Sequence, residues 1–134
     1  MLLNDALFRL NKSAGFVLKP DLLRSNFDLN DKSTWSESKV LNMTILSGSF
    51  LQRGSEKVDP KVQVTYHWPK SPEPSVMYKT KTIKNDGFPT WNESFDFTME
   101  LPELSFIRFR VVDDDVGKDD LGEVILITTV FTEL

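Results

Sequence analysis

Five aspartates lie within eight residues of one segment, from Asp113 to Asp120, which directly follows a strongly apolar run. Asp113 and Asp115 are two residues apart, so in an extended segment their side chains point to the same side, as two ligands of one ion must. A hard cation such as calcium takes about six to eight oxygen ligands from carboxylates, carbonyls and water. Two other loop segments carry such oxygens, 57–59 and 85–86. Three loops are therefore candidates for a shared cation site, although aspartate also caps its own backbone in ordinary exposed turns.

Other kinds of chemistry have little support in the sequence. The only histidine, His67, lies within a strand-like segment without an obvious acidic partner, so a general-base role is not indicated. The absence of cysteine excludes disulfides, thiolate zinc sites and cysteine nucleophiles. No glycine-rich phosphate loop, serine elbow or metal-hydrolase motif occurs. We therefore assign no catalytic residue to this chain.

The composition is that of one globular domain. The chain has 134 residues, of which 40% are hydrophobic and 27% charged, enough for one compact core. Its formal net charge of −4 gives no basis for binding nucleic acid. The first residues do not resemble a signal peptide, and no segment is long and apolar enough to cross a bilayer. We expect a cytoplasmic protein, which the lack of cysteine also fits.

Short segments of alternating polarity dominate the chain from about Lys39 onward. In the first of them, Leu41, Met43 and Ile45 fall on one side and polar residues on the other, which predicts a strand with one buried face. The predicted strands are 39–47, 61–68, 78–84, 91–100, 106–112 and 123–128, separated by turn-forming residues. Trp68, Trp91, Phe88 and Phe95 are predicted to pack in the core or under loops. Short strands without a long helical pattern predict an all-β antiparallel sandwich.

The first 38 residues or so have a different character. The segment 14–20 is apolar and ends at Pro20, which predicts a short strand stopped by proline. Asp21–Arg24 is predicted to form one helical turn, and 25–38 is a polar connector around Trp35. The whole segment is too small to hold a core of its own, so we expect it to pack on the sandwich or to extend from it.

The chain resembles the C-terminal part of eukaryotic phosphoinositide-specific phospholipase C. The segment NKSAGFVLKPDLLR is similar to the end of the Y half of that family's catalytic barrel, and LNMTILSG, VDPKVQV, NDGFPTWNESFDF and LPELSFIRFRVVDDD are similar to its C2 domain, in the same order. The resemblance implies three parts: 1–25 as the tail of the catalytic Y region, a remnant of a TIM-like barrel end; 26–38 as a linker; and 39–134 as an incomplete C2 domain. Because a C2 sandwich has more strands than are predicted here, the chain is expected to be a fragment that lacks its last strands.

The resemblance also implies a function. Enzymes of this family hydrolyse phosphatidylinositol 4,5-bisphosphate to diacylglycerol and inositol trisphosphate in intracellular signalling, using calcium. Their catalytic residues precede the GFVLKP segment, so the chain is expected to be inactive on its own. Its expected role is that of a calcium- and phospholipid-binding C2 module, which targets the enzyme's catalytic barrel to anionic membranes as a peripheral cytoplasmic protein.

The resemblance further assigns binding residues. The implied calcium ligands are Asp59, Asn85, Asp113, Asp115 and Asp120, with Asp119 as an alternative to the last and the Lys57 carbonyl as a backbone ligand. Asp114 is expected to be solvated. The loop SFLQRGSEK lacks the additional aspartate of strongly calcium-dependent C2 domains, so we expect weak binding that phospholipid oxygens complete. Lys79 and Lys81 are implied contacts for lipid head groups, although lysines on a strand also discourage edge pairing.

Two alternatives stay open at this point. The chain could be a stand-alone C2-like module that binds protein and is independent of calcium, in which case the acidic loops have no reason to converge. It could also be a structural remnant that is unstable in isolation, because missing strands expose sheet edges and part of the core.

Overall fold

The computed structural model describes residues 6, 8–9, 12, 14–52, 54, 56–70, 77–115 and 120–128. Its strands are β1 (Lys39–Ser47), β2 (Pro60–His67), β3 (Met77–Lys79), β4 (Thr90–Met99), β5 (Phe106–Asp113) and β6 (Asp120–Ile127). The short helical elements are α2 (Asp21–Arg24), η1 (Lys32–Thr34) and η2 (Pro102–Leu104). The helical turn at Asp21–Arg24 is as the sequence predicted.

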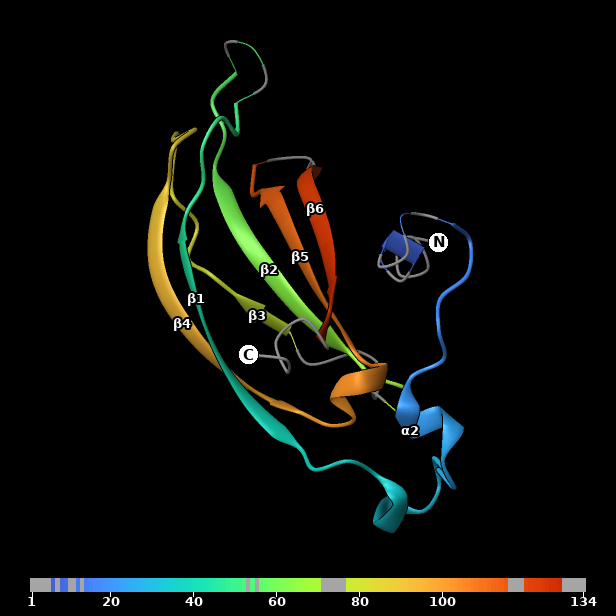
Figure 1. Ribbon diagram of the computed structural model, residues 1–134. Helices are drawn as coiled ribbons and strands as arrows, with labels where there is room; N and C mark the ends of the chain where they lie inside the picture. The colour runs from blue at the N-terminus through green and yellow to red at the C-terminus, as the bar shows by residue number, and fades with distance from the viewer. Residues whose placement is uncertain are drawn as a thin grey trace.

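The strands form two antiparallel sheets that face each other (Figure 1). One sheet pairs β1 with β4, and the other has the order β3-β2-β5-β6. The buried core between them consists of Val62, Val64, Tyr66, Trp91, Phe97, Met99 and Ile107. The prediction of an all-β antiparallel sandwich is confirmed.

The predicted alternation of β1 is confirmed in detail. Leu41, Met43 and Ile45 pack against the core, whereas the residues between them are exposed. Two exposed residues of β1 bond across the pair to β4: the Asn42 amide donates to Asp96 at 2.7 Å, and the Thr44 and Ser94 hydroxyls lie 2.8 Å apart. These cross-strand contacts hold the register in which Met43 lies opposite Phe95.

The third predicted strand is shorter than expected. The sequence predicted a strand over 78–84, but β3 ends at Lys79. At the next residue the Thr80 side chain takes a place in the ladder, because its hydroxyl accepts the Val62 N–H at 2.9 Å while the Thr80 N–H donates to the Val62 carbonyl at 3.0 Å. The backbone then leaves the sheet and returns to it only where the Ile83 N–H meets the Pro60 carbonyl at 3.1 Å.

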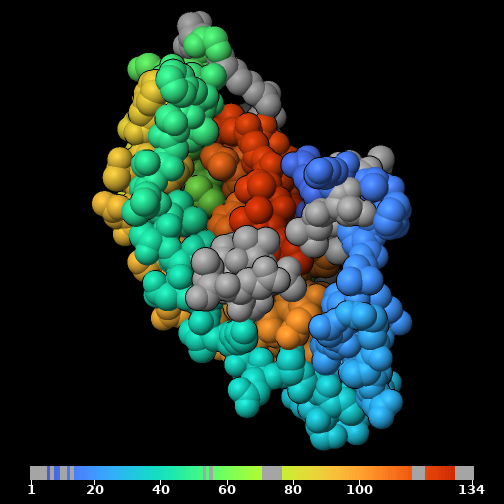
Figure 2. All heavy atoms as spheres, viewed as in Figure 1, coloured from blue at the N-terminus to red at the C-terminus, as the bar shows by residue number. Residues whose placement is uncertain are grey.

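The strand predicted at 14–20 is wrong. Within Ala14–Pro20 the backbone forms no regular element, and no described strand pairs with it. Phe16 and Leu18 are 68% and 78% exposed, and within 14–20 only Val17 and Pro20 are partly buried. The N-terminal segment instead lies against the side of the molecule formed by β5 and β6, as Figure 2 shows. It packs on the sandwich, which is one of the two outcomes that the sequence allowed.

The connector after α2 is fixed to the sandwich by aromatic contacts. Trp35 meets Trp68, which follows β2, edge to face with the ring centroids 5.7 Å apart. The ammonium groups of Lys32 and Lys70 lie 5.5 and 5.9 Å from the Trp35 ring centroid, within the range of cation–π attraction. The connector is therefore part of the folded unit.

One part of the inner surface is less covered than the rest. Val124 of β6 lies opposite Phe109, on the side of the sheet that carries the core residue Ile107, and yet it is 46% exposed. The two-stranded sheet thus does not extend over β6 as it does over β2. Such an open face is what a sandwich without its last strands would have, and the absence of those strands stays a prediction.

A buried tyrosine closes the end of the sandwich near η2. Tyr66 is 2% exposed, and its hydroxyl lies 2.5 Å from the Glu100 carbonyl and 2.8 Å from the Ser105 hydroxyl. Burial raises the pKa of this phenol to about 12, against an ordinary value of about 10. A raised folded-state pKa contributes stability that is complete below the unfolded-state pKa and is lost as the pH rises through the folded-state value.

We therefore expect Tyr66→Phe to change how stability depends on alkaline pH. The wild type should lose about 1.4 kcal/mol of unfolding free energy by about pH 11 through this residue alone, because the unfolded state releases the phenolic proton more readily. The variant should start about 1 kcal/mol less stable at neutral pH, having lost the hydroxyl contacts. Denaturant unfolding between about pH 8 and pH 11 measures the stability at neutral pH and its loss at alkaline pH. If the unfolding free energy fell equally with pH in the wild type and the variant, the raised pKa of Tyr66 would be contradicted.

Candidate functional site at the acidic loops

Three loops meet where β2 begins and β5 ends. Asp59 precedes β2 and Asp113 ends β5, and the antiparallel register places Pro60 opposite Asp113. The Asp59 N–H donates to Asp113 Oδ1 at 2.8 Å, and the Asp114 N–H donates to the Asp59 carbonyl at 2.9 Å. From the loop before β4, the Asn85 N–H donates to Asp59 Oδ1 at 2.7 Å. The fold thus brings together Asp59, Asn85 and Asp113, which are distant in sequence.

The loop that carries Asn85 is shaped by local hydrogen bonds. Asn85 has a φ of 55°, in the left-handed region that asparagine tolerates better than most residues. The Asp86 carboxylate accepts the Phe88 N–H at 2.8 Å, and the Asp86 N–H donates to the Val58 carbonyl at 3.0 Å. Asp86 therefore caps its own turn, whereas Asn85 is held against Asp59.

The carboxylates at this end repel one another. Partial desolvation raises the pKa of the Asp115 carboxyl, and the negative charges of Asp59 and Asp113 raise it further. Asp115 thus experiences the charge of both other carboxylates. The local field therefore favours a bound cation or proton.

The charge at this place fits a cation, but the side chains do not form a complete coordination shell. Among the residues that the structure describes, no group of three or more histidine, aspartate or glutamate side chains is arranged to hold a metal ion. One oxygen of Asp59 and one of Asp113 accept backbone N–H groups. Calcium binding here would need the loops to adjust or other oxygens to join, so it belongs among the proposals.

Two of the aspartates have basic partners. Asp114, expected to be solvated, forms an ion pair with Lys61 and accepts the Thr82 hydroxyl at 2.9 Å, so that expectation is wrong. Asp120 lies opposite Val112, and its Oδ1 is 2.5 Å from both Nε and Nη2 of Arg110. This ion pair directs the Asp120 carboxylate toward Arg110, and its role as a calcium ligand stays a prediction. Its alternative, Asp119, lies outside the described residues.

The predicted lipid-contacting lysines lie at the end of β3 and just after it, and the register places Lys79 opposite Gln63 of β2. Lys79 ends β3 and Lys81 follows it, both exposed, with the buried Thr80 between them. The Lys81 backbone is fixed on both sides, because its N–H donates to Glu93 at 3.0 Å and its carbonyl accepts the Trp91 indole N–H at 3.1 Å. The binding of lipid by Lys79 and Lys81 stays a prediction.

An exposed aromatic pair adjoins the acidic loops. Phe50 and Phe88 are 84% and 55% exposed, and their rings meet edge to face with the centroids 5.1 Å apart. The loops that carry them are joined by a hydrogen bond of 3.1 Å from Leu51 N–H to the Gly87 carbonyl. Phe50 has a φ of 58°, which is unusual for a bulky residue.

The sequence analysis did not identify this pair. It placed Phe88 among the residues that pack in the core or with loops; Phe88 is not in the core but meets Phe50 of another loop, which the sequence analysis did not single out. The available signal was a phenylalanine within each of two polar, turn-forming segments, SFLQRGS and NDGFP. That signal does not reveal exposure, because exposure depends on which loops meet.

Comparison with known proteins assigns the fold. A match to the C2 domain covers residues 39–131. Among solved structures, human GIVD cytosolic phospholipase A2 superimposes with a TM-score of 0.60 at 23% identity, covering 71% of this chain and 14% of that one. A C2 domain of plant extended synaptotagmin 1 gives 0.55 at 21% identity, covering 67% and 69%. No helix in the described part of the chain is long and apolar enough to span a membrane.

Curated relatives share more of the sequence. Mouse inactive phospholipase C-like protein 2 is 36% identical over 90% of this chain, and human 1-phosphatidylinositol 4,5-bisphosphate phosphodiesterase delta-1 is 36% identical over 87%. Mouse 1-phosphatidylinositol 4,5-bisphosphate phosphodiesterase zeta-1 is 35% identical over 81%. The chain spans only 12%, 17% and 18% of these three proteins. It belongs to the C2 domain family, and its sequence is homologous to the C2 regions of phosphoinositide phospholipases C.

Proposed function

We propose that this C2 domain binds anionic membrane surfaces through the end that carries the acidic loops, with calcium as the bridging ion. The observation that carries the proposal is the exposed pair of Phe50 and Phe88 beside Asp59, Asn85 and Asp113. Carboxylates alone would repel an anionic surface, and exposed phenylalanines alone would not select one. Together, the carboxylates can bind a cation that also contacts lipid head groups, and the phenylalanines can insert into the apolar layer of the same bilayer.

The phenylalanines supply the apolar part of the proposed contact. Moving an exposed phenylalanine side chain fully out of water is worth about 1.5 to 3 kcal/mol. The two rings already contact each other, and their loops are joined by a hydrogen bond. Insertion into a membrane would therefore cost little additional conformational entropy. Residues this large and apolar are seldom left exposed side by side without an interaction role.

The carboxylates supply the ionic part. We propose Asp59, Asn85, Asp113 and Asp115 as protein ligands for calcium, with phospholipid oxygens and water completing the shell. The raised pKa of Asp115, from partial desolvation and its anionic neighbours, supports a cation preference at this position. Neutralising these charges would remove the repulsion from the membrane. Lys79 and Lys81, both exposed, are proposed as secondary head-group contacts.

We further propose that the chain serves as the C2 part of a phosphoinositide phospholipase C. In this proposal residues 1–25 are the tail of the catalytic region and 26–38 the linker, and the hydrolysis of phosphatidylinositol 4,5-bisphosphate requires parts outside these 134 residues. The identities of 35% and 36% with the two named phosphodiesterases, over 81% and 87% of the chain, support it. One similar protein is named inactive, so homology alone does not decide whether the parent is catalytic.

A calcium-independent role in protein binding is the second candidate. It is favoured by the absence of a complete metal-binding group among the described residues. In that case Phe50 and Phe88 would anchor a protein partner, as exposed aromatic residues often do. Vesicle binding distinguishes the candidates, because only the first requires anionic lipid and calcium.

The aromatic pair makes the membrane proposal testable. Replacing Phe50 and Phe88 together by alanine should weaken binding to phosphatidylserine-containing vesicles in calcium by about 10- to 100-fold, because apolar burial in the bilayer is lost. Vesicle co-sedimentation measures the change. The control is Val40→Ala, which shortens a side chain of 72% exposure at the end of β1 that lies away from the acidic loops. If the double variant and the Val40→Ala control lost vesicle binding equally, or if neither lost it, the proposed contact would be refuted.

Asp115 provides a test that needs no membrane. Because its folded-state pKa is raised, its ionised form destabilises the fold, and stability falls as the pH rises through the folded-state value. In calcium-free buffer at about pH 7, Asp115→Asn should therefore raise Tm, and this gain should vanish at about pH 3 where the carboxyl is protonated. Added calcium should raise Tm of the wild type more than that of the variant.

Asp114 offers a matched control one residue away. Asp114→Asn removes the ion pair with Lys61, so it should lower Tm near neutral pH with or without calcium. Differential scanning calorimetry follows both variants. If calcium does not raise the wild-type Tm at any concentration up to the millimolar range, calcium binding in the absence of lipid is excluded.

A further inference from the structure

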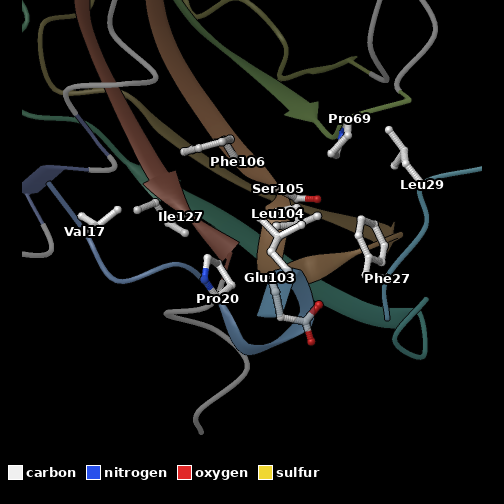
Figure 3. A pocket seen from close by; sticks show the side chains of 11 residues that line it. Val17, Pro20, Phe27, Leu29, Pro69, Glu103, Leu104, Ser105, Phe106 and Ile127 are labelled. Atoms are coloured by element: carbon white, nitrogen blue, oxygen red, sulfur yellow. The ribbon is translucent and has the colours of Figure 1, made fainter. Parts of the chain in front are cut away.

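A cavity of about 380 Å³ lies between the N-terminal segment and the outer side of β5 and β6. Figure 3 shows its lining, which comes from segments distant in sequence. The lining residues are Val17, Pro20, Leu23, Phe27, Leu29, Pro69, Glu103, Leu104, Ser105, Phe106 and Ile127. Phe106 and Ile127 are register partners at the start of β5 and the end of β6. The cavity is thus at the opposite end of the sandwich from Asp113, which ends β5.

Nearly the whole lining is apolar. The lining has two polar side chains. The hydroxyl of one of them, Ser105, already donates hydrogen bonds to the carbonyls of Glu100 and Leu101, at 3.0 and 2.7 Å. A water molecule needs about two to four polar partners, and these walls do not supply them. Cavities of about 300 to 1,000 Å³ with apolar walls and few polar groups are typical of small-molecule sites.

The remaining polar group is a carboxylate at the edge. Glu103 belongs to η2, and its Oε2 accepts the Ser36 hydroxyl at 2.7 Å, which holds the side chain between the helical turn and the connector. In Figure 3 its oxygens lie at the rim of the lining group, beyond Pro20 and Leu104. A negative group at this position disfavours an anionic ligand head and favours a cationic one.

The shape favours a chain. Val17 and Ile127 lie at one side of the lining group and Phe27, Leu29 and Pro69 at the other, with Leu104 between them (Figure 3). At about 30 Å³ for each methylene-sized group, the volume of 380 Å³ holds about a dozen groups. We propose that this cavity binds a single-chain amphiphile with a cationic head group, a long-chain amine whose alkyl chain lies along Leu104 and whose ammonium group pairs with Glu103.

The direct test uses dodecylammonium as the probe, below its micelle concentration, with the full chain in calcium-free buffer and without vesicles. Calorimetry should show saturable one-to-one binding, at least about 10-fold tighter than for dodecanoate of equal chain length. Methyl NMR shifts should be confined to the methyl-bearing residues of the lining, which are Val17, Leu23, Leu29, Leu104 and Ile127. Absence of saturable binding, or shifts centred on the acidic loops, would overturn the proposal and would leave the membrane proposal untouched.

Variants locate the site and its selectivity. Val17→Trp should fill the cavity and reduce binding of the amine at least about 10-fold, whereas Leu18→Trp, at a neighbouring residue of 78% exposure, should not. Glu103→Gln keeps the size of the side chain and should make dodecylammonium and dodecanoate bind about equally. If Val17→Trp unfolds the chain, the selectivity of Glu103→Gln still decides, because an unchanged preference for the amine would refute the role of Glu103.

Discussion

Strand β2 pairs antiparallel with β5 along the full length of both strands, from Pro60 with Asp113 to His67 with Phe106. The pairing places Val64 and Ile107, both fully buried, at the centre of the core. It also defines both ends of the molecule. At one end it brings Asp59 to Asp113, and at the other it presents Phe106 to the N-terminal segment. The acidic loops and the cavity are therefore opposite ends of one strand pair.

Electrostatics at the acidic end is divided between two kinds of carboxylate. Asp114 and Asp120 are neutralised by Lys61 and Arg110, and these ion pairs join neighbouring strands. Asp115 differs from these two, because desolvation and the negative charges of Asp59 and Asp113 raise the pKa of its carboxyl. Asp114 and Asp120 thus link neighbouring strands, whereas Asp115 is repelled by nearby carboxylates, a repulsion that a bound cation would relieve.

The N-terminal segment is a structural part of the domain although it forms no strand. The contact of Trp35 with Trp68 fixes the connector, and the hydrogen bond from Ser36 to Glu103 fixes it to η2. Because the segment crosses the outer side of β5 and β6 without filling the space beneath it, a cavity is left there. Apolar residues of a segment too short for its own core are thus partly buried on a neighbour, and Phe16 and Leu18 are left exposed.

The sequence by itself determined the strands with strong alternation, since burial of one face leaves a period of two that needs no knowledge of the partner. It also predicted that loops carrying Asp59, Asn85 and Asp113 would be candidates for one site. Only the tertiary structure decided which side chains those loops would meet. Lys61 and Asp114 are 53 residues apart, and Phe50 reaches Phe88 only because their two loops meet and are hydrogen-bonded to each other. Partners so distant in sequence leave no local pattern. The polarity pattern of a strand depends on its own residues, whereas its partners depend on which strands pair and in which register.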